Sequence, residues 1–504
     1  MQKLWLLLAL GSLTLMAACG GGGGSSSITS VTVTCSPSTI LYGQTSQCLA
    51  TVMGTGAFSS GVTWMASAGT ISSSGLFTAP SGGVVSLQVT VTATSMQDSS
   101  KSGTATVTVN PEGPPPSNVQ PITVDAGPEP QTFIDADEAF TSVTICVHGT
   151  STCQTIDHIQ VDTGSAGLRL ISSVLTITLP PENDSSGNPL DECAVFSDGY
   201  VWGPVATADI TMAGEQAAAA PVQIIIPSSS SPLVPSSCSS QSPMGGNGNE
   251  GGSSNSNSVS TFGANGIIGV GLFQQDCGGF CVNNSTNPSV YYDCPSSGCT
   301  PTTATLAQQV PNPVAMFATD NNGVLIQLPA VPNGGSASVS GSMIFGIGTQ
   351  SNNGLGSATI YPVPDTGNNA GNLITTFSGH SYPASFLDSG SNGIFFLDSS
   401  TTGISACSGQ NASWYCPATS PDNLSATNQG QDANGNPVGT AGTVNFTIEN
   451  ASNLFNTNNA AFSTLGGPNS GAFDWGLAFF FGRNVFTAID GMSTPGGTGP
   501  YFAY

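Results

Sequence analysis

Apolar and polar residues alternate along most of the chain, and helical periodicity is scarce. Between residues 28 and 110, Val and Thr alternate in short runs such as SVTVTC and VVSLQVTVTATS. Gly and Ser interrupt these runs at the spacing of short antiparallel strands. Because alternation buries one face of each strand, this part of the chain is predicted to form a small β-sandwich.

The same alternation continues from residue 119 to Tyr504, with Gly, Asn and Pro between the apolar runs. The whole protein is therefore predicted to be all-β. One run, TSVTICVHGTSTCQTIDHIQVD at residues 141–162, predicts a β-hairpin whose turn lies between Cys146 and Cys153. The second strand of this hairpin would end at Asp162.

A ten-residue motif occurs twice in this region, as VDTGSAGLRL at Val161–Leu170 and as LDSGSNGIFF at Leu387–Phe396. In both copies an apolar residue precedes an Asp, and a hydroxyl residue, Gly and Ser follow it. Gly lets the backbone turn sharply beside a carboxylate, and hydroxyl groups can donate hydrogen bonds to it. The motif predicts two strands that each end in a tight loop, in which hydrogen bonds fix the orientation of the Asp side chain.

This motif and three further segments resemble pepsin-like aspartic peptidases. ANGIIGVGL at residues 264–272 and FDWGLAFFFGRNVFTAID at residues 473–490 resemble the segments that fold back beside that family's two aspartate loops. GSMIFGIGTQ at residues 341–350 resembles the start of its second lobe. The resemblance implies a bilobal β domain with a central cleft, in which residues 121–334 form the N-lobe and residues 335–504 the C-lobe.

The resemblance also implies which residues carry the chemistry. Asp162 and Asp388 would be the catalytic pair. The supporting loop residues would be Thr163, Gly164, Ser165, Ser389, Gly390 and Ser391. Two carboxylates about 4 Å apart repel by roughly 4 kcal/mol at a protein-like dielectric, which separates their two titrations by about 3 pH units. The pair would share one proton at acidic pH, so that one Asp activates a water while the other polarises the carbonyl of a peptide substrate.

The chain departs from that family at two places. The segment at residues 196–214 occupies the position of the flap, a hairpin that closes over substrate and carries a Tyr. The flap candidates here are Phe196, Tyr200 and Trp202, of which Phe196 is best placed by Gly spacing but lacks the hydroxyl; all three can instead be core residues. Arg169 replaces a bulky aromatic, and strand alternation favours a place outside the cleft, paired with an acid; the alternative is a positive charge near the substrate.

The N-terminal sequence predicts that the protein is exported and anchored to a membrane. Residues 1–19 contain one Lys, an apolar run and the sequence LMAAC, which resembles a lipoprotein signal peptide ending at a lipidated Cys19. An ordinary secretory peptide is the alternative. The Gly after Cys19 favours the outer membrane, and the protein would face the periplasm or the cell surface. Residues 20–27 would be a Gly/Ser tether.

The sandwich predicted for residues 28–110 resembles bacterial immunoglobulin-like repeats through VTWMASAGTISSSGLFTAP at Val62–Pro80. The resemblance implies that Trp64 fills the core between two sheets. This domain would space the next one from the membrane. The Pro-rich residues 111–120 would form a semi-rigid linker.

Of the 13 cysteines, all except Cys19 are expected to form disulfides in an oxidising compartment. Short spacing suggests five pairs, although sequence alone does not fix them: Cys35 with Cys48, Cys146 with Cys153, Cys277 with Cys281, Cys294 with Cys299, and Cys407 with Cys416. Cys193 and Cys238 are left for each other. The sequence contains no C-x-x-C pair and no H-E-x-x-H motif, so neither a metal nor another cofactor is expected. The formal net charge of −24 argues against nucleic acid as a partner.

These patterns favour a monomeric, envelope-anchored aspartic endopeptidase acting on unfolded proteins or peptides. The alternative is a catalytically inactive surface receptor, adhesin or structural lipoprotein, because a fold can persist after its chemistry is lost. The full length, including the closing GPYFAY, resembles an uncharacterised family of bacterial secreted proteins. A serine hydrolase is disfavoured by the absence of a G-x-S-x-G motif.

Overall fold

The structure, a computed structural model, describes residues 25–80, 86–110, 118–128, 136–184, 186–197, 199–240, 256–283 and 288–504. It confirms the all-β prediction, because the α-helices among these residues are single turns of four residues each. None of the described helices is long and apolar enough to cross a membrane. The chain divides into two compact units, with the boundary between Pro115 and Pro116. The predicted leader, Cys19 and most of the linker lie outside the described residues.

The first unit is a β-sandwich of two four-stranded sheets. One sheet has the order β1 (Ser27–Ser36), β3 (Thr45–Thr55), β6 (Leu76–Thr78) and β5 (Thr70–Ile71). The other has the order β2 (Thr39–Leu41), β8 (Ser102–Asn110), β7 (Leu87–Ser95) and β4 (Val62–Ala66). Alternate residues of both sheets pack into one apolar core, and Trp64 contributes to it only partly buried. Membership of the Ig-like class stays a prediction.

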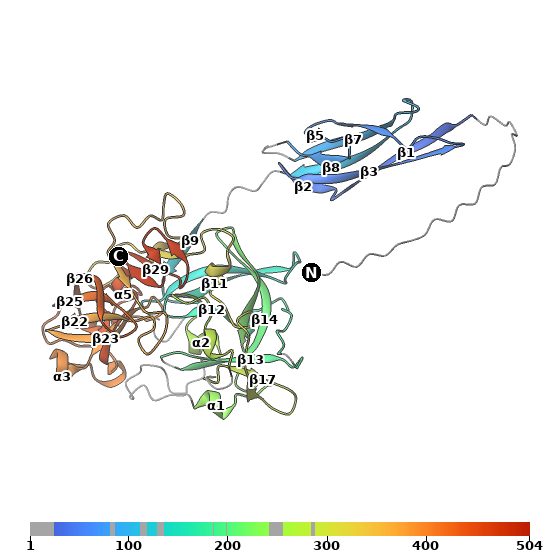
Figure 1. The fold of residues 1–504 in the computed structure, drawn as a ribbon. Helices are drawn as coiled ribbons and strands as arrows, with labels where there is room; N and C mark the ends of the chain where they lie inside the picture. Colours follow the sequence, from blue (N-terminus) through green and yellow to red (C-terminus); the bar gives the residue numbers. More distant parts are fainter. Residues whose placement is uncertain are drawn as a thin grey trace, which may run out of the picture. The chain divides into compact units, whose positions relative to one another are not determined.

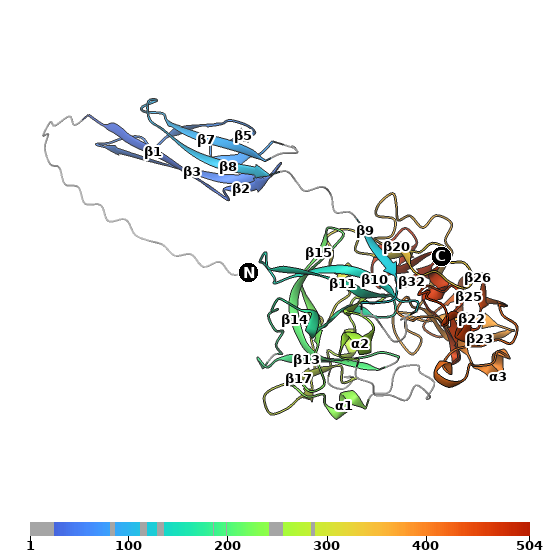
Figure 2. The same ribbon diagram turned by 180° about the vertical axis from the view of Figure 1, so that it is seen from behind.

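The second unit contains two large sheets (Figure 1). The fifteen-stranded sheet runs in the order β18 (Thr300–Pro301), β17 (Tyr291–Asp293), β13 (Leu190–Val195), β14 (Tyr200–Met212), β15 (Glu215–Ile225), β12 (Ala166–Ile171), β16 (Gly266–Val270), β11 (Cys153–Asp162), β10 (Ala139–Cys146), β9 (Val119–Val124), β20 (Val339–Phe345), β19 (Gly323–Gln327), β29 (Asn484–Ala488), β32 (Tyr501–Ala503) and β21 (Ile360–Pro362). Figure 2 shows β9 and β20 side by side, where the early and late parts of this unit join.

The seven-stranded sheet belongs to the later half of the unit. Its order is β26 (Pro437–Ile448), β25 (Asp422–Gln431), β22 (Leu373–Phe377), β23 (His380–Leu387), β28 (Asn469–Trp475), β24 (Ile394–Leu397) and β27 (Gly466–Gly467). A small ribbon joins β30 (Ser493–Thr494) to β31 (Gly497–Thr498). The helical turns are α1 (Ser236–Ser239), α2 (Val259–Phe262), α3 (Ser399–Thr402), α4 (Ala451–Leu454) and α5 (Leu477–Phe480), with 3₁₀ turns at Ser172–Val174, Gly278–Phe280, Pro313–Met316 and Gly409–Asn411.

The same three-strand arrangement occurs twice. In the first half, β16 runs parallel to β11 and antiparallel to β12. In the second half, β28 runs parallel to β23 and antiparallel to β24. The loop between the first two strands of each set contains the repeated motif, and the third strand is the segment that was predicted to fold back beside it. The duplicated sequence therefore folds as a duplicated structure.

All six predicted disulfides are present, which is typical of an extracytoplasmic protein. The predicted hairpin before Asp162 is confirmed, because β10 and β11 pair antiparallel with Cys146 opposite Cys153. The carboxylate of Asp432 accepts backbone N–H bonds within the β25–β26 turn, and that of Asp320 accepts bonds from the side chains of Thr349 and Gln350. The described residues hold no cluster of metal-ligating side chains.

Removing the bridge between Cys193 and Cys238 is expected to destabilise the fold by about 2–4 kcal/mol, because it closes a long loop in the unfolded chain. Its two cysteines are 45 residues apart and fully buried. Replacing both by Ala, and measuring urea unfolding under oxidising conditions, tests this. The matched control is the same double replacement at Cys277 and Cys281, which are only 4 residues apart. A loss in the control as large as in the test variant would contradict the loop-length explanation.

Candidate active site

The two repeated loops lie against each other, and their backbones are joined by reciprocal hydrogen bonds. The backbone N–H of Thr163 donates to Ser389 Oγ at 3.1 Å, and the backbone N–H of Ser389 donates to Thr163 Oγ1 at 2.9 Å. Ser389 Oγ also donates to the Val161 carbonyl at 2.8 Å. Thr163 and Ser389 are buried at 3% and 0% exposure. These bonds fix the spacing of the two motifs, because buried polar groups need partners.

The two Asp side chains are aimed by their own loops. The backbone N–H of Gly164 donates to Asp162 Oδ1 at 2.6 Å, and the hydroxyl of Ser165 donates to Asp162 Oδ2. In the second loop the N–H of Gly390 donates to Asp388 Oδ1 at 2.8 Å. Each carboxyl group is therefore held in a fixed orientation by donors of its own loop.

The carboxyl groups of Asp162 and Asp388 face each other across the joined loops. A Cβ atom placed on Gly164 would lie 2.6 Å from Asp388 Cγ, and one on Gly390 would lie 2.7 Å from Asp162 Oδ1. Both glycines are therefore required, since any side chain would collide with the opposite carboxyl group. Gly164 is exposed and Asp388 partly exposed, so solvent reaches the pair.

Electrostatics couples the two acids. Burial of the carboxyl group raises the pKa of Asp388 well above its usual range, and the negative charges of Asp162 and Asp474 and a hydrogen bond with the Asp162 carboxyl raise it further. A raised pKa on one of two facing carboxyls means that the pair retains one proton at acidic pH. Asp162 itself is buried at 4% exposure.

The flap candidates occupy different environments. β13 and β14 form the predicted hairpin, and Phe196 lies at its tip, where its N–H donates to the Gly199 carbonyl at 2.8 Å. Phe196 is partly exposed. Trp202 is fully buried against Tyr292, and Tyr200 is 6% exposed, so both side chains belong to the core. Phe196 is therefore the most exposed of the three flap candidates.

Arg169 does not lie near the surface, although it is paired with acids as the sequence suggested. It is 3% exposed, and its guanidinium donates to Glu192 of β13 at 2.5 Å and to Asp276 at 3.3 Å. Its Cζ atom lies 5.9 Å from the centre of the Phe196 ring. Strand alternation correctly separated Arg169 from its apolar neighbours, but both faces of β12 are covered by protein. The ion pair links β12 to the β13–β14 hairpin.

Sequence reasoning missed one acid of the site. Asp474 lies in β28, within the segment FDWGLAFFF, and is 7% exposed. Ser391 Oγ lies 2.6 Å from Asp474 Oδ2 and 3.0 Å from Asp388 Oδ2. An acidic residue between two large aromatics of a buried strand was the available indication, because charged residues are rarely buried without a partner.

Replacing Ser389 by Ala is expected to cost about 1–3 kcal/mol of stability, because the buried Thr163 N–H loses its acceptor. The separation of the Asp162 and Asp388 carboxyl groups should change at the same time. Thermal unfolding of Ser389→Ala and of the control Ser389→Thr, which keeps the hydroxyl, measures this effect. If both variants lose the same stability, the Ser389 hydroxyl does not hold the loops together.

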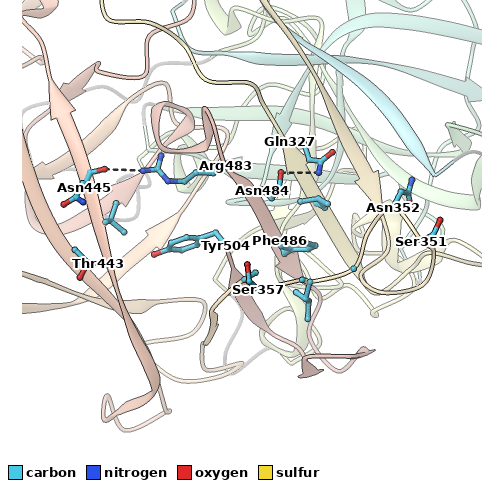
Figure 3. A pocket seen from close by; sticks show the side chains of 16 residues that line it. Gln327, Ser351, Asn352, Ser357, Thr443, Asn445, Arg483, Asn484, Phe486 and Tyr504 are labelled. Atoms are coloured by element: carbon cyan, nitrogen blue, oxygen red, sulfur yellow. Dashed lines mark hydrogen bonds between the residues drawn. The ribbon is translucent and has the colours of Figure 1, made fainter.

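A cavity of about 890 Å³ lies elsewhere in the second unit (Figure 3). Gln327, Asn352, Asn445, Arg483 and Tyr504 are among its lining residues, and Asp162 and Asp388 are not. Figure 3 shows Arg483 bonded to the Asn445 carbonyl, at 3.3 Å. This cavity is therefore separate from the paired acids.

Comparison with known proteins gives a family but little more. A sequence model described as "Protein of unknown function (DUF3443)" matches residues 114–504. Among solved structures, the aspartic proteinase from Irpex lacteus is similar with a TM-score of 0.43 and 15% identity, over 76% of this chain and 96% of that one. No curated protein matches the sequence. What the two loops can do chemically is therefore decided by their own geometry.

Proposed function

We propose that this chain, which belongs to the family described as "Protein of unknown function (DUF3443)", is an aspartic endopeptidase of the cell envelope. It would hydrolyse peptide bonds at acidic pH with a water activated by Asp162 and Asp388. The observation that supports this is the pair of facing carboxyl groups, each held by a glycine N–H and set against the glycine of the opposite loop.

The proposed reaction uses the shared proton. One ionised oxygen of the pair accepts a proton from a water between the two acids, while the protonated partner donates to the substrate carbonyl. Water attack gives a tetrahedral intermediate, and its collapse passes a proton to the leaving amine. Neither Asp forms a covalent bond. The loops need not move, because the bonds between Thr163 and Ser389 already fix them in place.

The test of this function is digestion of an unfolded protein by the mature full chain, from about pH 3 to pH 7, in comparison with Asp162→Asn and Asp388→Asn. We expect cleavage by the parent that peaks at acidic pH, a loss of at least about a hundredfold in each variant, and inhibition by a statine-type transition-state mimic. Asp137→Asn, which alters a buried acid outside the loops, is the matched control.

Equal inertness of the parent and both variants would contradict the peptidase. It would favour the alternative of a non-catalytic receptor, adhesin or structural lipoprotein, in which the two loops serve only to join the halves of the domain. Cleavage that survives in both Asn variants would point to a contaminating enzyme.

We place the protein at the outer membrane through a lipid on Cys19, as a monomer. The sequence before Cys19 supports this, and the disulfides agree with an extracytoplasmic location. Two or more acyl chains hold a protein stably in a bilayer, so Cys19→Ser is expected to move the protein from the membrane fraction to the soluble fraction. Mass spectrometry of the mature N-terminus would identify the lipid, and an unmodified N-terminus would contradict the anchor.

A further inference from the structure

Asp474 is a buried acid directly behind the proposed catalytic pair. β28 carries it between β23 and β24, opposite Phe386 and Phe395. The flanking Phe473 and Trp475 stack on each other in the apolar core, with ring centres 5.2 Å apart. Because side chains alternate along a strand, Asp474 points away from that core and toward the loop of Asp388.

The Ser391 hydroxyl lies between two carboxyl groups but has only one hydrogen to donate. Its oxygen is 2.6 Å from Asp474 Oδ2 and 3.0 Å from Asp388 Oδ2. If both acids were ionised, they would compete for that hydrogen. The Ser391 oxygen would then face one carboxylate oxygen with no hydrogen between them, which is repulsive. Both contacts are hydrogen bonds only if one of the two carboxyls carries a proton and donates to Ser391 Oγ.

The surroundings favour Asp474 as the proton carrier. Its Oδ1 has no hydrogen-bond partner, and no ion pair to it is present in the described part of the chain. The charged groups that face it are Asp162 and Asp388, both acidic. Asp388, in contrast, accepts the Gly390 N–H, which stabilises its ionised form. Burial raises the pKa of Asp474 to about 8, a bond from Ser391 opposes this rise, and the charge of Asp162 adds to it.

The first half of the domain lacks this feature. β16 and β28 occupy equivalent registers, since Gln160 pairs with Ile267 just as Phe386 pairs with Asp474. Ile267 therefore stands where the second half has an acid. The Ser165 hydroxyl donates to Asp162, and no hydrogen bond from it to a second acid is present among the described residues. The surroundings of Asp162 and Asp388 therefore differ.

We propose that Asp474 is a positioning residue of the catalytic pair: its protonated carboxyl donates to Ser391 Oγ and commits the Ser391 hydrogen to Asp388. The chain of bonds runs from Asp474 to Ser391 to Asp388, and it supplies Asp388 Oδ2 with a fixed hydrogen-bond donor. This proposal rests on the proposed peptidase function for its effect on activity. The hydrogen-bond chain itself can be measured without activity.

The first measurement is a carbon-13 NMR titration of the full chain labelled at the Asp carboxyl carbons. The Asp474 resonance is assigned by its absence in Asp474→Asn. We expect this resonance to keep the chemical shift of a protonated acid up to about pH 7. If it titrates below about pH 5, like an exposed Asp, the proposal is overturned whether or not the protein cleaves peptides.

The second measurement is the pH profile of kcat and KM. Asp474→Asn stays neutral and can still donate to Ser391, so its kcat at acidic pH should remain within about threefold of the parent. Asp474→Leu cannot donate, so its kcat should fall about tenfold, with KM little changed and the profile midpoint shifted. Equal profiles for the two variants and the parent would overturn the positioning role. A parent that cleaves no peptide while Asp474 remains protonated would reject the peptidase and keep the hydrogen-bond chain.

Discussion

Raising the pH from about 4 to about 8 is expected to lower the free energy of unfolding by several kcal/mol, so that this protein is most stable in acid. The cause is a set of buried acids without cations. Burial raises the pKa of Asp191 to about 7, and both of its carboxyl oxygens lack partners among the described residues. The pKa of Asp474 is raised to about 8, again mainly by burial.

The direction follows from proton binding. Between the unfolded pKa near 4 and the folded pKa, the folded state binds more protons than the unfolded state, so stability falls as pH rises. At 1.36 kcal/mol for each pKa unit, Asp191 accounts for about 4 kcal/mol and Asp474 for about 6 kcal/mol as upper limits. Acids with lowered pKa values, such as Asp209 and Asp398, act in the opposite direction but below about pH 4.

Thermal or urea unfolding at about pH 4, 6 and 8 measures this dependence. Asp191→Asn and Asp474→Asn should each flatten the curve, because an amide does not titrate. Asp398→Asn, which changes an exposed helix-capping acid, is the control and should leave the slope between pH 4 and pH 8 unchanged. A stability that is constant or rises over this range would show that these acids are ionised in the folded state.

The repeated motif explains why the core of the site could be predicted from sequence. Asp162 and Asp388 each follow an apolar strand and stand two residues before a Gly. Two copies of such a loop can join by hydrogen bonds between their hydroxyl residues and backbone N–H groups when they face each other. Five of the six disulfides were predictable for a similar reason, because short sequence spacing limits which cysteines can meet, and the pair of Cys193 and Cys238 followed by elimination. These features depend on local sequence, which a single chain displays directly.

The environments of Arg169 and Asp474 depend on distant segments and were not predictable in the same way. The acids that pair with Arg169 lie 23 and 107 residues away in the sequence. Alternation in β12 shows only on which side of the strand the Arg169 side chain lies. Asp474 lies in an apolar segment that was identified only by its resemblance to a strand beside the second aspartate loop. Its meaning appears only when β28 places it beside Ser391, 83 residues earlier in the chain. Burial of a charge is decided by packing, which no local pattern records.

Replacing Arg169 by Met is expected to destabilise the fold by about 3–5 kcal/mol, because it leaves buried acids without their cation. Arg169 is the cation that Glu192 and Asp276 share in the described structure, and Tyr291 donates to Asp276 at 2.8 Å. Burial and the neighbouring Glu192 raise the pKa of Asp276 well above its usual range. With a proton on Asp276, the net charge of Arg169, Glu192 and Asp276 is close to zero. Removing Arg169 leaves a buried negative charge without a cation.

Two comparisons separate the charge from the packing. Arg483→Met removes an arginine that donates to the backbone carbonyls of Phe479 and Asn445 instead of to acids, so its loss should be smaller, about 1–2 kcal/mol. Adding Glu192→Met to Arg169→Met should recover much of the lost stability, since apolar residues can replace a buried ion pair. Urea unfolding at neutral pH measures all three variants. Equal losses for the two arginine variants, with no recovery in the double variant, would mean that Arg169 acts by its volume rather than by its charge, and that the β13–β14 hairpin is held to β12 by packing.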